Sequence, residues 1–519
     1  MKKSSLWILM VLVLIAAACG TTASPQQQQA AETATDDLGS LDSALPPGAT
    51  INDKGQVVSS SGEVLGSAED FGISTGSGRS VGGPVADGGT GSSSGGSGLR
   101  SGGGQGVPAA AAPGITDSKI YVGVGWSDAG AANQAFAGAA LNSDIRDPMN
   151  AMIEEVNKSG GIAGRKIEPI YHNYEAASSQ TIDQQDQAAC ARYTQDNKVF
   201  AILGDGDIMQ QCAEKAGAVL LTVTSTSLPE DFQRYPHFIE ISGMNLIRVG
   251  NVSVTGLHRE GYFSDGAKLG LVTWDEPNYR DAVERGYLPA LKKKGVKPAT
   301  DTAYISSPQT ADDLAAASAD VNNAVLRFQS QGITHVMLID GATPLCRGGC
   351  LGILWTRRSE SQNYRPRYGF NAGNAAKAAQ EQGLYPTEQL GGSIAVEWGD
   401  SDKFADQGWK LNKARERCYD IMRKRNVPMD NANKEADART ACEFIWFLQT
   451  VIDVELGNAT ITNDNFIAGV NALGWTYSSA MAYAVHFSAT QHDGNSAARN
   501  MRFVDNCECY RWTGDPYRV

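Results

Sequence analysis

The pattern of apolar and polar positions changes near residue 115. From there to the C-terminus, short apolar runs typical of buried strands alternate with longer segments whose apolar residues recur every three or four positions, as on one helix face. The first series predicts strands at 119–124, 167–171, 199–203 and 219–223, with helices at 145–160, 178–197 and 210–216. A second series predicts strands at 268–273, 302–305 and 335–339, with helices at 279–294 and 314–328.

Two series of strand–helix alternation predict an α/β fold with two doubly wound parallel-sheet lobes, each with helices on both faces of its sheet. In such sheets, ligands bind beyond the carboxyl ends of the strands. With two lobes, we expect those ends to face each other across a cleft.

The part before residue 115 has few large apolar residues, and 75–106 are mostly Gly and Ser. Such a segment buries too little apolar surface to offset the entropy of ordering it, so 19–114 is predicted to be a flexible tether. A weak alternation over 49–58 and 62–65 predicts a small hairpin within it.

The N-terminus has the pattern of an export signal. Lys2 and Lys3 precede an apolar run over 6–18, which is too short to span a bilayer as a mature helix and ends in three alanines before Cys19. This pattern resembles a bacterial lipobox, which predicts a signal peptide over 1–18 and lipidation of Cys19. The alternative is an ordinary signal peptide cleaved near Ala18. Either interpretation places the protein outside the cytoplasm, at the cell membrane if lipidated.

Export explains the remaining cysteines. An even number in an oxidising compartment suggests disulfides. A zinc site on a Cys-x₃-Cys and a Cys-x-Cys pair is the alternative, but these spacings fit a zinc knuckle poorly, and the six histidines form no pair at helical spacing. We therefore predict no metal and no cofactor. The eight cysteines are Cys190, Cys212, Cys346, Cys350, Cys418, Cys442, Cys507 and Cys509.

The chain is acidic, with 57 Asp and Glu against 44 Lys and Arg. This balance disfavours nucleic acid as a partner and any electrostatic hold on anionic lipid. The globular part contains no P-loop, dinucleotide fingerprint, zinc-protease motif or nucleophile elbow placed between a strand and a helix, so the sequence does not favour an enzyme.

Two segments carry a specific resemblance. Gly114-Ile-Thr-Asp-Ser-Lys-Ile-Tyr-Val-Gly123 resembles the opening of the type I periplasmic binding proteins of the branched-chain amino-acid (Leu/Ile/Val) receptor family, whose members serve ABC transporters. Ala151-Met-Ile-Glu-Glu-Val-Asn-Lys-Ser-Gly-Gly-Ile-Ala-Gly-Arg-Lys-Ile167 looks like the family's first helix and following turn. The resemblance is good over 114–225, moderate over 265–372 and thin after about residue 390. Physically, Gly160-Gly161 ends the helix and Gly164 allows the tight return.

The resemblance implies three crossings between the lobes, which form the hinge. Lobe one would comprise 115–241 with 393–480, and lobe two 242–392 with 481–519. It also implies a disulfide between Cys190 and Cys212, and it places Cys418 and Cys442 on neighbouring helices. The other four cysteines would share lobe two, with all three connectivities open.

Binding residues follow from position after the strands. The loop at 224–227 is where related receptors hold an amino acid's carboxylate with hydroxyl and backbone N–H groups. Asp205 precedes a predicted helix whose N–H groups suit an anion, although Asp207 there is more simply a helix cap. Tyr279 is as readily explained by helix packing as by a pocket wall. The predicted ligand-binding residues are Trp126, Ser127, Asp205, Thr224, Ser225, Thr226, Trp274, Asp275, Tyr279, Asp340 and Asn371.

One departure from the family concerns the ligand. An acidic residue that pairs with the ligand's ammonium is usual where this chain has Asn371-Ala-Gly-Asn374. Asp340 or Asp275 are the candidate substitutes, because an ammonium in a closed cleft needs a compensating charge. This departure argues against a simple branched-chain amino acid and leaves amides, urea-like solutes, sugars and acids open.

The resemblance therefore predicts a monomeric, lipid-anchored solute-binding protein of an ABC importer. It would close by hinge motion on a small polar solute, an amino acid or a related amide or acid, and present it to a membrane permease. A receptor that signals to a membrane partner is the alternative, since the fold serves both uses.

Overall fold

The computed structural model describes residues 50–51, 56–58, 64–67, 112–127, 144–175, 178, 180–204, 207–264, 266–310, 313–343, 349–399, 407–457 and 459–519. All of them belong to the compact unit Pro46–Val519. The signal peptide, Cys19 and most of the predicted tether lie outside the described residues. Within that stretch, β1 (Thr50–Ile51), β2 (Gln56–Val58) and β3 (Val64–Ser67) form a small antiparallel sheet where a hairpin is predicted.

The first large sheet has five parallel strands in the order β5-β4-β6-β7-β8. Their bounds are β4 Lys119–Ser127, β5 Lys166–Tyr174, β6 Ala201–Leu203, β7 Val219–Thr222 and β8 Phe238–Glu240. The helices between them are α2 Arg146–Lys158, α3 Ile182–Cys190 with a π-helical continuation over Ala191–Asp196, α4 Asp207–Ala216 and α5 Pro229–Arg234. Four later segments complete this lobe: α12 Lys413–Lys424, α13 Ala432–Gln449, a π-helical turn Thr450–Leu456 and α14 Asn463–Ala472.

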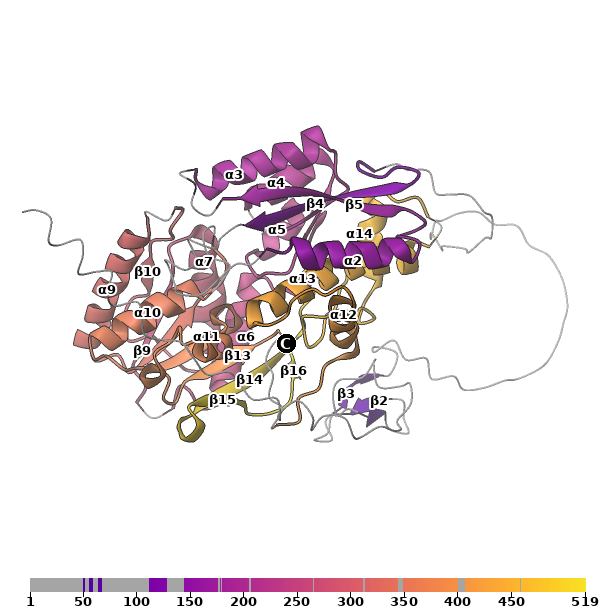
Figure 1. Ribbon diagram of the computed structural model, residues 1–519. Coiled ribbons are helices and arrows are strands. Elements are labelled where there is room, and N and C mark those ends of the chain that lie inside the picture. Colours follow the sequence, from indigo (N-terminus) through magenta and orange to yellow (C-terminus); the bar gives the residue numbers. More distant parts are fainter. Residues whose placement is uncertain are drawn as a thin grey trace, which may run out of the picture. The chain divides into compact units, whose positions relative to one another are not determined.

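Helices cover both faces of this sheet. On one face, α2, α12, α13 and α14 pack their apolar side chains against β4, β6 and β7, and Figure 1 shows α13 running beside α2. On the other face, α3, α4 and the π-helical segment pack against the same strands. The predicted doubly wound lobe is therefore present.

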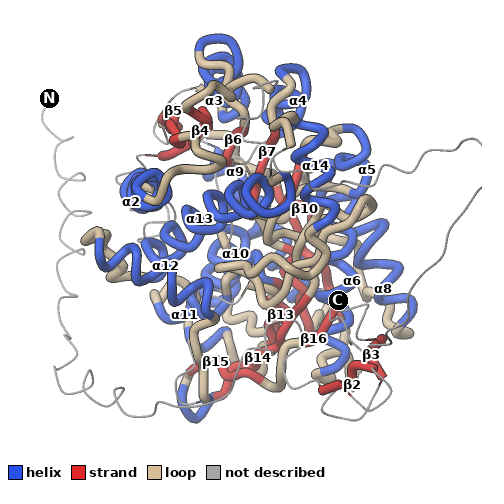
Figure 2. The backbone as a smooth tube through the Cα atoms, turned by 90° about the vertical axis from the view of Figure 1, so that its right-hand side faces the viewer, coloured by secondary structure: helices blue, strands red, loops and turns tan. Residues whose placement is uncertain are grey.

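The second sheet repeats the strand order of the first and adds antiparallel strands. β10 (Ala303–Ile305), β9 (Leu269–Trp274), β11 (His335–Ile339), β12 (Arg367–Asn371) and β13 (Ile394–Glu397) are neighbours in that order and parallel. β14 (Ala497–Val504), β15 (Cys509–Trp512) and β16 (Tyr517–Arg518) continue it antiparallel. Figure 1 shows β4 and β5 of the first sheet apart from β13, β14 and β15 of the second, and Figure 2 shows the same strands from the side.

The helices of the second lobe cross between its parallel strands. They are α6 Leu246–Arg259, α7 Pro277–Asp281 with a π-helical segment Ala282–Tyr287, α8 Leu288–Lys293, α9 Leu314–Ser330, α10 Cys350–Ser361 and α11 Ala376–Glu381. Short 3₁₀ turns lie at Ala372–Asn374, Thr387–Gln389 and Asp505–Cys507. Together with the sheet they enclose a separate hydrophobic core.

The chain changes lobes at places that differ in part from the predicted ones. At the first change, Ile241 packs in the core of lobe one and Met244 in that of lobe two. β13 belongs to the second sheet, so the second change follows Glu397 rather than residue 392. Phe487 still packs in the core of lobe one, so the third change follows it rather than residue 480.

The turn after α2 has the conformation that its glycines predict. Gly160, Gly161 and Gly164 have φ of 110°, 81° and 74°. A Cβ on Gly161 would lie 2.0 Å from the carbonyl oxygen of Arg165. Only glycine fits there, because the chain turns directly back into β5.

Disulfides join neighbouring helices in lobe one. Cys190 bonds Cys212 between α3 and α4, and Cys418 bonds Cys442 between α12 and α13, the two pairs that the resemblance implies. In lobe two the partner of Cys507 is Cys509, two residues away, which removes the thiolates that the zinc alternative needs. Cys350 is also disulfide-bonded, and Cys346 lies outside the described residues.

Candidate functional site

In both lobes, the strand order places the crevice where a ligand binds beside the first strand, at β4 and β6 in lobe one and at β9 and β11 in lobe two. The carboxyl ends of these strands and of their neighbours β7 and β12, with the loops that follow them, carry the predicted binding residues that the structure describes, except Tyr279, which lies in α7. The candidate site is therefore built from these strand ends and the loops that follow them.

The loop between β7 and α5, residues 223–228, is held by β8 of its own lobe and by the segment where the chain passes to lobe two. The backbone N–H groups of Thr226 and Ser227 both donate to Oε1 of Glu240, at 3.2 and 3.1 Å. The hydroxyl of Ser225 accepts from the backbone N–H of Met244, at 2.9 Å. Both anchors lie where the chain first passes to lobe two, so the loop and this crossing form one unit.

Glu240 is fully buried and sits beside a second buried acid, Asp493, where the chain makes its third crossing. Burial raises the pKa of Glu240 to about 8, and the charge of Asp493 contributes. Asp493 accepts from the backbone and side-chain N–H groups of Asn245, both at 2.9 Å, and from Arg248 at 2.6 Å. The two crossings and the first turn of α6 are thus joined by one buried polar network.

Lobe two contacts the same loop from the opposite side. The side-chain amide of Asn278, in α7, donates to the carbonyl of Thr226 at 3.0 Å. Next to it, Arg285 makes two hydrogen bonds to the carboxylate of Glu230 in α5, at 2.5 and 2.9 Å. We call these contacts, Asn278–Thr226 and Arg285–Glu230, the interlobe clasp. They join α5 and the β7–α5 loop of lobe one to α7 and the π-helical segment of lobe two.

Glu276 lies within electrostatic reach of acidic groups from both lobes. Glu276, at the start of α7, is half-buried and accepts from the side-chain amide of Gln309 at 3.3 Å. Burial raises its pKa, and the charges of its neighbour Asp275 and of Asp183 in α3 raise it further. The clasp side of the site therefore carries negative charge from both lobes.

Three of the predicted residues of lobe two meet in its interior. Trp274 is fully buried and donates from Nε1 to Asp340, at 3.1 Å. Asp340 also accepts from the backbone N–H groups of Gly341 and Gly352, at 2.9 and 3.0 Å, and burial raises its pKa to about 6. Tyr279 is buried and donates to the carbonyl of residue 342 at 2.8 Å. The polar atoms of these side chains are thus bonded to groups of lobe two itself.

The other two predicted residues of lobe two are also engaged. Asn371 is buried and donates to the carbonyl of Asp340 at 2.9 Å. Asp275 is exposed and pairs with Arg280. Of the two candidate partners for a ligand's ammonium, Asp275 is therefore paired with an arginine, and Asp340 is hydrogen-bonded to N–H groups of lobe two.

In lobe one, β4 ends with Trp126 and Ser127. The half-buried Trp126 ring lies under the guanidinium of Arg146, 3.4 Å from its centroid, and the hydroxyl of Ser127 donates to the carbonyl of Tyr174 at 2.9 Å. Thr224, Ser225 and Thr226 come together in the β7–α5 loop. Asp205 lies outside the described residues.

Sequence reasoning missed Glu240, Asn278, Arg285 and Glu276. A signal existed for Glu240 alone: it is the one charged residue in the apolar run 238–241, where a strand is expected to be buried. The other three lie two to eleven residues beyond the end of β9, at the start of a helix or on one, where many similar polar residues occur.

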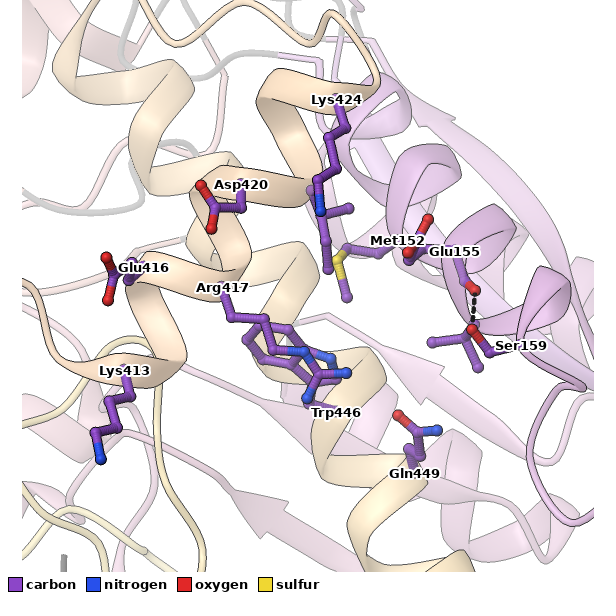
Figure 3. Close-up of a pocket in the computed structure, with 12 residues that line it drawn as sticks. Met152, Glu155, Ser159, Lys413, Glu416, Arg417, Asp420, Lys424, Trp446 and Gln449 are labelled. Atoms are coloured by element: carbon purple, nitrogen blue, oxygen red, sulfur yellow. Dashed lines mark hydrogen bonds between the residues drawn. The ribbon is translucent and has the colours of Figure 1, made fainter. Parts of the chain in front are cut away.

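A separate pocket of about 300 Å³ lies among helices α2, α12 and α13 (Figure 3). Figure 3 shows the Arg417 guanidinium over the ring of Trp446, 4.8 Å from its centroid, with Met152 beside Lys424. This pocket is lined by helix side chains of lobe one and contains none of the predicted binding residues. It is lined by Met152, Glu155, Val156, Ser159, Lys413, Glu416, Arg417, Asp420, Ile421, Lys424, Trp446 and Gln449.

Solved structures resemble this chain throughout its two lobes. A branched-chain amino-acid ABC transporter protein from Thermus thermophilus with bound valine superposes with a TM-score of 0.57, covering 78% of this chain and 97% of that one at 12% identity. The fatty-acid ABC transporter substrate-binding protein from Thermomonospora curvata gives 0.54, covering 79% and 94% at 15% identity. A solute-binding protein from Rhodopseudomonas palustris in complex with p-hydroxybenzoic acid gives 0.54, covering 77% and 97% at 11% identity.

The fold is that of the type I periplasmic binding proteins. The predicted α/β architecture with two parallel-sheet lobes is thereby confirmed. No protein-family model and no curated protein sequence matches the chain. Among the residues described for this type I fold, no helix is long and apolar enough to cross a membrane, and no three His, Cys, Asp or Glu side chains group as metal ligands do.

Proposed function

We propose that this protein is the solute-binding subunit of an ABC importer, which captures a small polar solute between its two lobes. The observation that carries the proposal is the contact between the lobes at the strand ends. The β7–α5 loop of lobe one and α7 of lobe two meet through the Asn278–Thr226 hydrogen bond, beside the place where a doubly wound sheet binds ligands. Closing two such lobes on a solute shields it from water.

The structural neighbours support a solute in this place. Those proteins are described with bound valine, as a fatty-acid transporter subunit and in complex with p-hydroxybenzoic acid. These molecules differ widely in chemistry, so the shared fold supports solute capture but not one class of solute. In this proposal the subunit makes and breaks no bond, and its partner is a permease in the membrane.

The N-terminal segment completes the proposal. Lipidation of Cys19 would hold the protein at the outer face of the membrane, and the Gly/Ser-rich stretch would let a monomer reach the permease. Metabolic labelling with a fatty-acid analogue tests this part. We expect wild type to be labelled and Cys19→Ser to remain unlabelled; equal labelling of both would contradict the anchor.

A thermal-shift screen of amino acids, amides, amines, sugars and organic acids tests solute binding. A solute that binds only the folded state raises the unfolding midpoint, by an amount that grows with its concentration over Kd. We expect at least one class to do so, and isothermal titration calorimetry to give one site per chain. If none of these classes shifts the midpoint, the proposed function is wrong.

A matched pair of variants ties binding to the interlobe site. Asn278→Ala removes an amide bonded across the lobes, whereas Asn251→Ala removes an amide whose bond, 2.9 Å to the carbonyl of Ile247, lies within α6. We expect the first to weaken the solute found in the screen and the second to leave its affinity unchanged. Equal effects would contradict binding between the lobes.

A further inference from the structure

The polarity of the β7–α5 loop bears on which solutes the site accepts. An anion at such a loop is normally bound by backbone N–H groups. Here the N–H groups of Thr226 and Ser227 are already bonded to the buried side chain of Glu240. The chain thus fills its own anion-binding position with an internal carboxyl group.

The same loop offers an acceptor toward lobe two. The carbonyl of Thr226 receives the amide N–H of Asn278 across the lobes, at 3.0 Å. A carbonyl attracts N–H and O–H donors and repels a carboxylate. Asn278 uses one lone pair of this oxygen, and the second can accept only from a donor, so this position favours a solute that donates hydrogen bonds.

The charges around the site agree with this polarity. Glu276 accepts a hydrogen bond from the amide of Gln309 at 3.3 Å and lies within electrostatic reach of Asp183 in the opposite lobe, and no cation pairs with either acid among the described residues. Three arginines near the strand ends are each paired with an acid of the chain. The pairs are Arg146–Asp144, Arg280–Asp275 and Arg285–Glu230.

We infer that the site takes solutes through N–H donors, as an amide or an amine presents them, and discriminates against free carboxylates. This inference rests on the proposed function, because it names the chemistry of that same site. The expected solutes of this chain would then differ from valine and p-hydroxybenzoic acid, which carry a carboxylate and are bound by two of the structural neighbours.

Solutes matched on one carbon skeleton test the inference on the wild-type protein. One set is isocaproamide, isoamylamine and isocaproate, and a second is p-hydroxybenzamide and p-hydroxybenzoate. We expect the amide or the amine of a set to bind about tenfold or more tightly than its carboxylate, because the carboxylate meets a carbonyl and acidic groups. The two arms distinguish an amide solute from an amine.

The outcomes separate the inference from the proposed function. If carboxylates bind as tightly as their amides and amines, the inference is wrong while the proposed function stands. If no compound of any class binds, the proposed function fails and takes the inference with it.

Chemical rescue tests the role of Glu240 without any knowledge of the solute. Glu240→Ala leaves the N–H groups of Thr226 and Ser227 without their acceptor, so acetate or formate should raise the unfolding midpoint of this variant. Wild type and Glu240→Gln, which retains Oε1, should not respond. A folded Glu240→Ala variant that gains nothing from acetate, or an equal gain in all three proteins, would overturn the assignment. If Glu240→Ala does not fold, the matched solutes still decide the inference.

Discussion

The interlobe clasp predicts how strongly the two lobes hold together before a solute arrives. Asn278→Ala removes one partly buried hydrogen bond between an amide and a carbonyl. Such a bond contributes about 1 kcal/mol, which is about a fivefold change in the ratio of closed to open molecules. The Arg285–Glu230 pair has two bonds, but its side chains are 43% and 39% exposed, so solvent screening limits it to about 0.5 kcal/mol, or about twofold.

The double variant Asn278→Ala/Arg285→Ala is therefore expected to shift the equilibrium toward the open form by about tenfold if the two contacts are independent. Single-molecule FRET between dyes at Lys215 in lobe one and Lys293 in lobe two measures the populations directly. Only the Arg285 part should shrink in high salt, because an exposed ion pair is screened.

Asn251→Ala serves as the control, since its bond lies within a single helix. A weaker closed state also lowers apparent solute affinity in proportion to the closed fraction. If the double variant has the populations of wild type, or if Asn251→Ala opens the lobes equally, the clasp does not set the closure equilibrium.

Two further predictions concern redox chemistry and pH. The Cys507–Cys509 disulfide, in which Cys507 is exposed, should be reduced by mild dithiothreitol before the Cys418–Cys442 disulfide, whose cysteines are fully buried. Alkylation followed by mass spectrometry shows which cysteines are reduced first. Earlier reduction of Cys418–Cys442 would refute this prediction. Glu240 has a folded-state pKa of about 8 against an ordinary value of 4.5, so its contribution to stability is full below pH 4.5 and is lost as the pH rises toward 8. Across this pH range, the midpoint of thermal unfolding should fall less steeply for Glu240→Gln than for wild type. Parallel dependence of the two midpoints on pH would show that Glu240 does not titrate in this way.

The strand–helix rhythm was sufficient to predict most of the parallel strands, because each buried strand is a short apolar run and each helix has one apolar face. Antiparallel strands β14 to β16 escaped prediction. Their sequence mixes charged and aromatic residues, as in Arg499, Arg502 and Trp512, since one face of each strand is only partly covered. The predicted lobe boundary near 393 differs from the structure because β13 can be assigned to the second lobe only once its pairing with β14 is known. The boundary near 480 differs because Phe487 packs in the core of lobe one.

The binding residues were harder to predict because a position after a strand does not fix where its side chain points. Trp274 and Asp340 both lie at strand ends, yet they bond to each other in the interior of lobe two. Conversely, Glu240 accepts hydrogen bonds from Thr226 and Ser227, which lie fourteen and thirteen positions earlier in the chain, and only folding brings these residues together. Which loops face each other was predictable; which atoms they present was not.

A crystal structure of the protein with the best solute from the screen tests the central claim most directly. We expect the solute to lie between the lobes, with a donor N–H directed at the β7–α5 loop and the Asn278–Thr226 hydrogen bond formed beside it. Solute density confined to the pocket of α2, α12 and α13, with the space between the lobes empty, would contradict it.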